Sequence, residues 1–215
     1  MLTVKVDIGT EFYEHSRNGK KAAYLAINRS VDGMVTNISR ELRAIYNVPK
    51  QEIDKRLRKI KAPSADSLSG QVTVLNKDEV RSALPLVLYG AKGRMLGTGS
   101  NIKTSFTKKG AQKQTELKKD VMGVSFTVLQ AGGKGYSSNA VIMAGGGGSV
   151  QVVRFIKGAP KDKRIKELRT LSITSMLRKR ADILVRVEQQ ARDTFTKYYK
   201  DTLAYLETRA GKGQG

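Results

Sequence analysis

The stretch NGKKAAYLAINRSVDGMVTNISRELRAIY, residues 18–46, decides how the fold begins. Large apolar side chains recur in it at steps of three and four residues, and most charged residues fall on other faces. This period matches the 3.6-residue turn of a helix with one buried face. The apolar stripe consists of Ile27, Val31, Met34, Val35, Ile38, Leu42 and Ile45. We therefore expect a long amphipathic helix from Asn18 to about Tyr46, in which Gly33 costs about 1 kcal/mol relative to Ala.

The segment that follows predicts a second, basic helix. Asn47-Val48-Pro49 interrupts the first pattern, and Pro49 suits the first turn of a new helix because that position needs no N–H donor. One apolar edge then continues to residue 61, and basic residues occupy the other faces. The apolar edge is Ile53, Leu57 and Ile60, and the basic residues are Lys50, Lys55, Arg56, Arg58, Lys59 and Lys61.

The middle of the chain predicts strands separated by polar and glycine-rich loops. Short alternating or apolar runs, bounded by turn residues, are typical of an antiparallel sheet. The candidate strands are 3–8, 71–75, 84–89, 101–106, 123–129, 139–144 and 150–156. We expect Gly90–Ser100 to be a loop, 101–129 to be a long basic hairpin, and the glycines at 145–148 to join the last two strands in another hairpin.

The end of the chain predicts a second long helix. Neither Pro nor Gly occurs between Pro160 and Gly211, and Ser172 or Thr174 is the expected N-cap. One face carries apolar residues at helical spacing: Ile173, Met176, Leu177, Leu184, Val187, Ala191, Phe195 and Tyr198.

The order of these elements predicts an α+β fold with a central, mainly antiparallel sheet, long N- and C-terminal helices, and extended basic and glycine-rich hairpin loops. We see no linker that would divide residues 1–215 into two cores. The parts of this single domain are a helical region at 18–61, strands and long loops at 69–157, the terminal helix at 172–207 and a polar tail at 208–215.

Charge is the strongest compositional signal. Forty Lys and Arg oppose 19 Asp and Glu, which gives a net charge of +21 and a pI near 10.2. Such an excess repels itself, so it indicates an anionic partner, of which nucleic acid is the commonest. Because aromatic residues make up only 6% of the chain and no zinc module is present, we expect contact with the backbone and no sequence-specific readout.

Two groups of basic residues are the candidate contacts with DNA or an acidic partner. The first group lies in the expected hairpin and comprises Lys108, Lys109, Lys113, Lys118 and Lys119. The second lies in the expected basic helix and comprises Arg56, Arg58 and Lys59.

The sequence offers little for enzymatic chemistry. It has no cysteine, and its one histidine, His15, lies in a polar stretch typical of a solvated loop. Gly132-Gly133-Lys134-Gly135 lacks the spacing of a phosphate-binding loop, so a turn explains it better. We expect no catalytic site, cofactor or metal. Lys5 and Asp7 argue against a signal peptide, and no apolar run approaches the ~18 residues of a membrane span.

Three blocks of sequence resemble the prophage minor tail protein Z family, the tail completion proteins of long-tailed bacteriophages. The first block runs from Ala26-Ile27-Asn28-Arg29 through Arg40-Glu41-Leu42-Arg43 to Tyr46-Asn47-Val48 and Ile53. The second is Leu84-Pro85-Leu86, followed by Tyr89-Gly90. The third runs from Val152-Val153-Arg154 through Arg164-Ile165-Lys166-Glu167-Leu168 to Ser172-Ile173-Thr174-Ser175-Met176. Lys163-Arg164-Ile165 lacks the proline common in the family there, and the loops at 90–123 and 130–149 match no part of it.

The resemblance implies a structural virion protein at the head–tail junction, made in the host cytoplasm and incorporated into the tail or neck. It implies a homo-oligomeric ring, expected to be hexameric, beside a tail terminator or a neck (stopper or adaptor) protein. The tail tube, the tape measure protein and the phage DNA backbone are further expected partners, and a membrane is not. The alternative is a cellular nucleic-acid-binding protein without sequence specificity, associated with the ribosome or the nucleoid.

Overall fold

The computed structural model describes residues 2–7, 16–75, 83–96, 100–107, 111–117, 123–144, 149–158, 160 and 164–212. It is an α+β fold in which long helices near both ends of the chain accompany antiparallel strands, so the predicted fold class is confirmed. Within the described residues, neither long helix contains an apolar stretch sufficient to span a bilayer.

The chain divides into two compact units, where the sequence predicted one core. Unit 1 comprises Met1–Glu41, Asp54–Asn76 and Leu177–Gly215, and unit 2 comprises Leu42–Ile53 and Lys77–Met176. Each unit is therefore assembled from separated segments of the chain. The chain passes from one unit to the other four times, which is why the sequence shows no single boundary between them.

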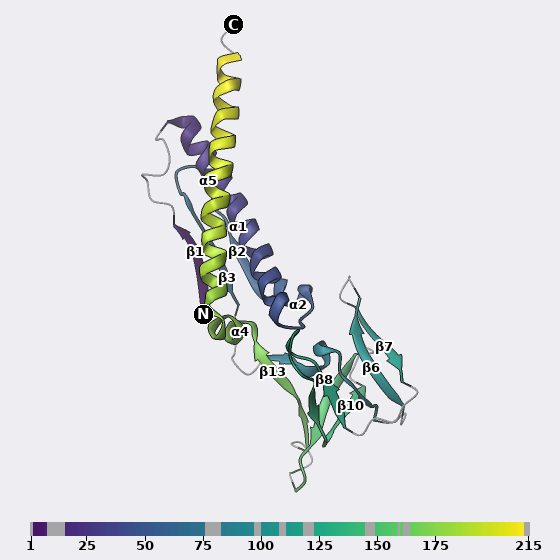
Figure 1. The fold of residues 1–215 in the computed structure, drawn as a ribbon. Helices are drawn as coiled ribbons and strands as arrows, with labels where there is room; N and C mark the ends of the chain where they lie inside the picture. The colour runs from purple at the N-terminus through teal and green to yellow at the C-terminus, as the bar shows by residue number, and fades with distance from the viewer. Residues whose placement is uncertain are drawn as a thin grey trace. The chain divides into compact units, whose positions relative to one another are not determined.

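Unit 1 is a small sheet covered by two helices (Figure 1). The sheet has the antiparallel order β1-β3-β2, formed by β1 (Leu2–Asp7), β3 (Ser69–Val74) and β2 (Leu57–Ile60). Helix α1 (Arg17–Ile45) follows the predicted span closely, and its last turn belongs to unit 2. Five residues of the predicted apolar stripe are fully buried (Ile27, Val31, Met34, Ile38 and Leu42), and the other two, Val35 and Ile45, are only partly buried.

Helix α5 (Ala181–Lys212) lies antiparallel to α1 in unit 1. An ion pair joins Arg186 to Glu41 at 2.9 Å, and the guanidinium of Arg29 lies 4.9 Å from the centre of the Tyr198 ring. Successive residues of α5 thus meet earlier residues of α1. These cross-links fix the register of the two helices.

The predicted helix at 50–61 is wrong beyond its first turn. Helix α2 ends at Asp54 (Lys50–Asp54), and Leu57–Ile60 form strand β2, in which Leu57 pairs with Val74. Apolar steps of four and three residues fit a helix, but the backbone of this segment bonds to the ladder of β3. Tertiary pairing has overridden a weak local preference.

Unit 2 is built almost entirely of short strands. They form a five-stranded sheet (β7-β6-β5-β8-β9), a three-stranded sheet (β10-β11-β12) and a pair (β13-β4), all with antiparallel ladders among the described residues. The strands are β4 (Ala83–Pro85), β5 (Lys92–Arg94), β6 (Asn101–Phe106), β7 (Gln112–Glu116), β8 (Val124–Phe126), β9 (Gly135–Ser137), β10 (Ala140–Ala144), β11 (Val150–Phe155), β12 (Ile165–Glu167) and β13 (Arg169–Ser172).

Three predictions for this region need correction, and one is confirmed. Residues 101–129 are not one hairpin, because β6 pairs with β7 and β8 pairs with β5 and β9. The expected loop 90–100 contains strand β5, and residues 84–89 pass from β4 into a buried 3₁₀ turn, η2 (Leu86–Tyr89). Strands β10 and β11 pair as predicted, and the glycines at 145–148 that were expected to join them lie outside the described residues.

The C-terminal helical region is broken once. Ser172 caps α4 (Ile173–Lys179), since its Oγ accepts a hydrogen bond from the N–H of Ser175 at 3.0 Å, and Arg180 separates α4 from α5. Ile183 is fully buried where Leu184 was predicted to face the core. Helix α5 also continues to Lys212, so residues 208–212 are helical and not part of a polar tail.

Candidate polyanion interface

One face of the five-stranded sheet belongs to the interior of unit 2. On β6, Ile102 and Thr104 are buried, and Thr104 Oγ1 donates to the carbonyl oxygens of Val87 and Ala91 at 3.1 Å. Side chains alternate between the two faces along a strand. Residues 101, 103 and 105 therefore point to the other face.

The cross-strand register extends this other face over all five strands. Residues directly opposite one another on paired strands share a face. Lys103 pairs with Lys92 and Thr115, and Ser125 pairs with Lys92 and Tyr136. One row of side chains thus crosses the sheet from edge to edge: Tyr136, Ser125, Lys92, Lys103 and Thr115.

Two further basic residues share this face. Arg94 is opposite Asn101, and Lys113 is opposite Ser105, both next to the row. We call Lys92, Arg94, Lys103 and Lys113 the cationic face. Lys92 is half-buried and the other three side chains are exposed.

The described strand residues on this side of the sheet include no carboxylate. Glu116 is opposite Ile102, which places it on the other face. Lys92 and Lys103 lie directly across from each other, an arrangement that destabilises a sheet unless an anion neutralises it. The cationic face is therefore suited to an anion that spans several strands.

A hollow of about 580 Å³ in unit 2 includes Lys103 of the cationic face in its lining. Lys103 and Ser105 of β6 line one part of the hollow. The cations Arg43, near the end of α1, and Lys50, at the start of α2, line another part. The remaining lining residues are Asn47, Val48, Pro49, Gln51, Leu88, Gly90, Thr104, Phe106, Thr107 and Gln130, none of them acidic. The hollow can accept an anionic group without opposing charge.

Backbone bonds hold the wall of this hollow in place. The N–H of Asn47 donates to the carbonyl of Val128 at 2.8 Å, and its side-chain amide donates to the carbonyl of Thr127 at 3.2 Å. The end of α1 is thereby tied to the segment that follows β8. Arg43 and Lys50 flank this attachment point in the sequence.

Of the five predicted hairpin lysines, the structure places one on the cationic face. Lys113 lies on β7, exposed. Lys108, Lys109, Lys118 and Lys119 lie outside the described residues. They remain predicted contacts.

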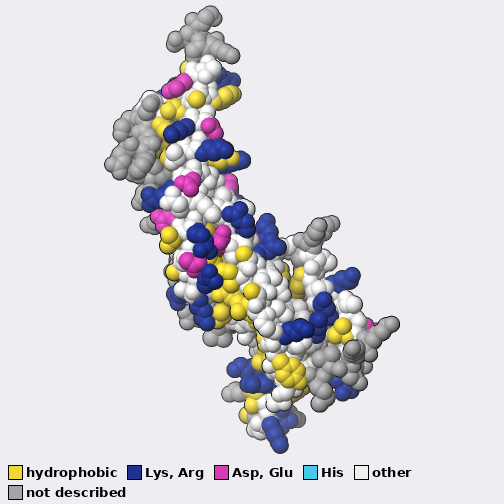
Figure 2. All heavy atoms as spheres, viewed as in Figure 1, with side chains coloured by type: hydrophobic (Ala, Val, Ile, Leu, Met, Phe, Trp, Pro, Cys, Tyr) yellow, Lys and Arg dark blue, Asp and Glu magenta, His cyan; other side chains and the backbone are white. Residues whose placement is uncertain are grey.

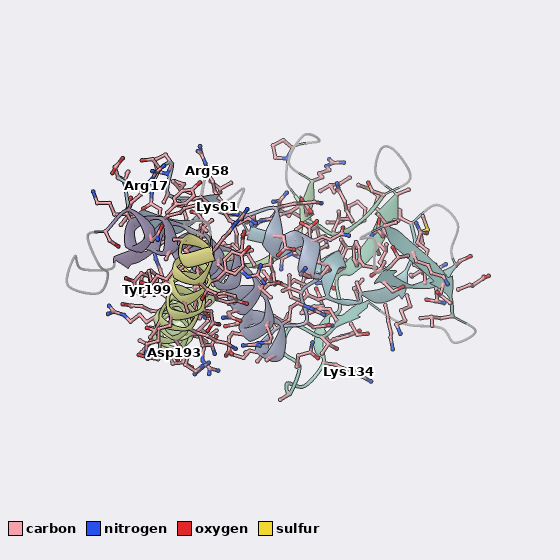
Figure 3. All side chains as sticks on the ribbon, turned by 90° about the horizontal axis from the view of Figure 1, so that it is seen from above. Arg17, Arg58, Lys61, Lys134, Asp193 and Tyr199 are labelled. Carbon is pink, nitrogen blue, oxygen red and sulfur yellow. The ribbon has the colours of Figure 1, made fainter. Side chains whose placement is uncertain are left out.

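The second predicted group belongs to unit 1, whereas the five-stranded sheet belongs to unit 2. Arg58 is exposed on β2 and extends away from the ribbon (Figure 3), and the Arg56 side chain is half-buried. Lys59 and Lys61 donate to Asp32 at 2.8 and 2.6 Å. Burial alone would raise the pKa of Asp32, but these hydrogen bonds outweigh it and hold the pKa below 3.8. The charge of Lys59 is already compensated within the unit.

Lys92, Arg94 and Lys103 were missed from the sequence. The glycines at 90, 93, 97 and 99 made this stretch look like a loop, so no strand register could be assigned. One signal in the sequence could have indicated this pairing. Lys92-Gly93-Arg94 and Asn101-Ile102-Lys103 both alternate, and the middle residue of each triplet, which points inward, is small or apolar.

The glycine-rich stretch at 132–137, expected to be a turn, is a strand in its second half (β9, Gly135–Ser137). Gly135 begins β9, and a side chain there would overlap the ring of Phe126 on β8. The glycine is required for close strand pairing. In the part of the chain that the structure describes, no three His, Cys, Asp or Glu residues gather to hold a metal ion.

Comparison of the chain with protein-family models, with curated proteins and with solved structures gave no match.

Proposed function

We propose that the protein is a structural, non-enzymatic component of the virion of a long-tailed bacteriophage, which completes the head-proximal end of the tail. It forms a homo-oligomeric ring around the DNA channel at the head–tail junction and supports head–tail joining. Tail terminator and neck proteins are its neighbours. The observation that carries the proposal is the cationic face of unit 2, and the sequence resemblance in three blocks adds the phage context.

The cationic face supports contact with DNA that does not depend on sequence. Cations on a sheet surface neutralise phosphates and release condensed counterions, which gives affinity without base readout. A channel protein needs this property because DNA of any sequence passes it.

The ring is tested by the size of the purified protein. Native mass spectrometry at low ionic strength, alone and with purified tail tubes, should give a single closed oligomer, of six copies if the resemblance holds. Its location is tested by mass spectrometry of purified virions. A monomer that does not add to tail tubes, together with its absence from virions, would overturn the phage assignment.

A cellular nucleic-acid-binding protein is the second candidate, because the cationic face fits ribosomal or nucleoid nucleic acid equally well. Sedimentation of a cell lysate through a sucrose gradient separates the two proposals. Migration with ribosomal particles that is lost on nuclease treatment would favour the cellular assignment.

A further inference from the structure

The edge-to-edge row of the cationic face includes one aromatic side chain. Tyr136 on β9 is 58% exposed, and through Ser125 it lies two strands from Lys92. At ordinary strand spacing this separation is about 10 Å. The other aromatic residues of the sheet, Phe106 and Phe126, are half-buried and lie on the opposite face.

Two glycines set the position of this tyrosine. Gly123 has a positive φ of 71°, and a side chain there would come within 2.9 Å of the Tyr136 hydroxyl oxygen. Gly135, the residue before Tyr136, accommodates the Phe126 ring on the inner face. The strands β8 and β9 thus approach closely, and the hydroxyl end of the Tyr136 side chain lies over the backbone of Gly123, with 58% of the residue exposed. Lys134, also exposed, precedes this strand and extends away from the ribbon (Figure 3).

An exposed ring beside a line of cations fits one form of nucleic acid better than another. In a duplex the base faces are stacked inside, so a protein surface meets phosphates, sugars and base edges but no base face. A single strand offers both phosphates and base faces, and stacking on an aromatic ring is sequence-tolerant because every base has a π-face. An acidic peptide could pair its carboxylates with the lysines, but it has no base to stack on the tyrosine ring.

We propose that the cationic face binds single-stranded nucleic acid, with a base stacked on Tyr136 and phosphates held by Lys92 and Lys103. This inference rests on the contact with polyanions in the proposed function and adds the class of nucleic acid. Ser125 and Thr115 complete the row with hydroxyl groups that can donate to phosphate or sugar oxygens.

The test is fluorescence anisotropy with a labelled 20-nucleotide DNA strand and with the same strand annealed to its complement. The wild-type protein should bind the single strand at least about tenfold more tightly than the duplex at equal salt. Tyr136→Leu keeps an apolar side chain and removes the π-face, so it should weaken single-strand binding about tenfold, an effect within the range of one stacked base. Duplex binding should be unchanged, and Tyr136→Phe should bind like the wild type.

A second variant separates this inference from the function on which it rests. Lys92→Gln with Lys103→Gln should weaken binding of both probes, and thermal unfolding followed by circular dichroism establishes that each variant is folded. Equal affinity of the wild-type protein for both probes, or single-strand binding unaffected in Tyr136→Leu, would overturn the stacking proposal alone. Failure of the wild-type protein to bind either probe would overturn the proposed contact with DNA as well.

Discussion

The two units carry the same number of Lys and Arg residues but differ in how many acidic residues accompany them. Each has 20 Lys and Arg, but unit 1 has 12 Asp and Glu (net +8) and unit 2 has seven (net +13). On the side of the molecule shown in Figure 2, Asp and Glu side chains lie among the basic ones over the helices of unit 1 and are scarce over the strands of unit 2.

The contacts follow the same division. In unit 1, acidic side chains bridge separate elements, as Asp32 does between α1 and the end of β2, and Glu41 between α1 and α5. Asp182 bonds to Arg180 and Arg186, which lowers its pKa. In unit 2, the register places Lys92 and Lys103 side by side with no carboxylate on the described strand residues of their face. Unit 1 thus uses charge to hold its own elements together, whereas the described strand residues around Lys92 and Lys103 in unit 2 offer these cations no carboxylate, which supports the proposed contact with a polyanion.

The largest effect on stability is expected from the interior of unit 1. Gly70 on β3 is buried, and a side chain there would lie 2.5 Å from Val31 Cγ2 and 2.9 Å from Ile27 Cγ2. Both are β-branched residues in the core of α1, so neither can move freely. Gly70→Ala should lower the free energy of unfolding by about 1–3 kcal/mol, measured by urea denaturation.

The matched control is Gly133→Ala in unit 2, where an added Cβ meets nothing within 4 Å. It should leave the unfolding midpoint unchanged. If Gly70→Ala unfolded at the same urea concentration as the wild-type protein, β3 would not pack on α1 as closely as the structure shows. The salt dependence of DNA binding should be unaffected by either change, which separates packing in unit 1 from binding by unit 2.

A smaller gain in stability is expected in the same helix. Gly33 lies in the interior of α1, and an added Cβ would have no neighbour within 4 Å. Gly33→Ala should raise the free energy of unfolding by about 0.5–1 kcal/mol, since alanine loses less backbone entropy on forming a helix. Unchanged or lower stability in urea would contradict the helical environment assigned to this residue.

The smallest effect concerns the ion pairs of unit 1. Asp32 has a lowered pKa, so its interaction with Lys59 and Lys61 stabilises the fold above the unfolded pKa and is lost as the pH falls below 3.8 through the folded pKa. Asp32→Asn should cost less than about 1 kcal/mol at pH 7, because the pair is exposed. The difference from the wild-type protein should shrink as the pH is lowered through the folded pKa of Asp32, as followed by thermal unfolding. A difference that does not change with pH would contradict this role.

The parts of the fold with long periodic patterns were predictable, and those fixed by pairing were not. Helix α1 and the N-cap at Ser172 followed from local spacing and side-chain type. Strands β2 and β5 did not, because Leu57–Ile60 also fits a helix and Lys92–Arg94 also fits a loop until their partners are known.

The candidate site shows the same limit. Lys113 could be singled out from a run of basic residues, but its relation to Lys92, Arg94 and Lys103 depends on the register of three strands. Charge composition predicted that a polyanion binds. It did not predict which residues share a face, since a shift of one residue in any strand would move its lysines to the other side.

The salt dependence of DNA binding tests the central claim most directly. The variant of unit 2 is Lys92→Gln, Arg94→Gln, Lys103→Gln and Lys113→Gln, and the control of equal charge is Arg17→Gln, Lys21→Gln, Lys197→Gln and Lys200→Gln, four exposed residues of unit 1. Binding of a 30-base-pair duplex is measured between 50 and 200 mM NaCl. We expect the slope of log K against log[NaCl] to fall by up to ~0.9 for each lost phosphate contact in the first variant and to stay near the wild-type value in the control. Equal slopes in the two variants would contradict the assignment of DNA contact to the cationic face.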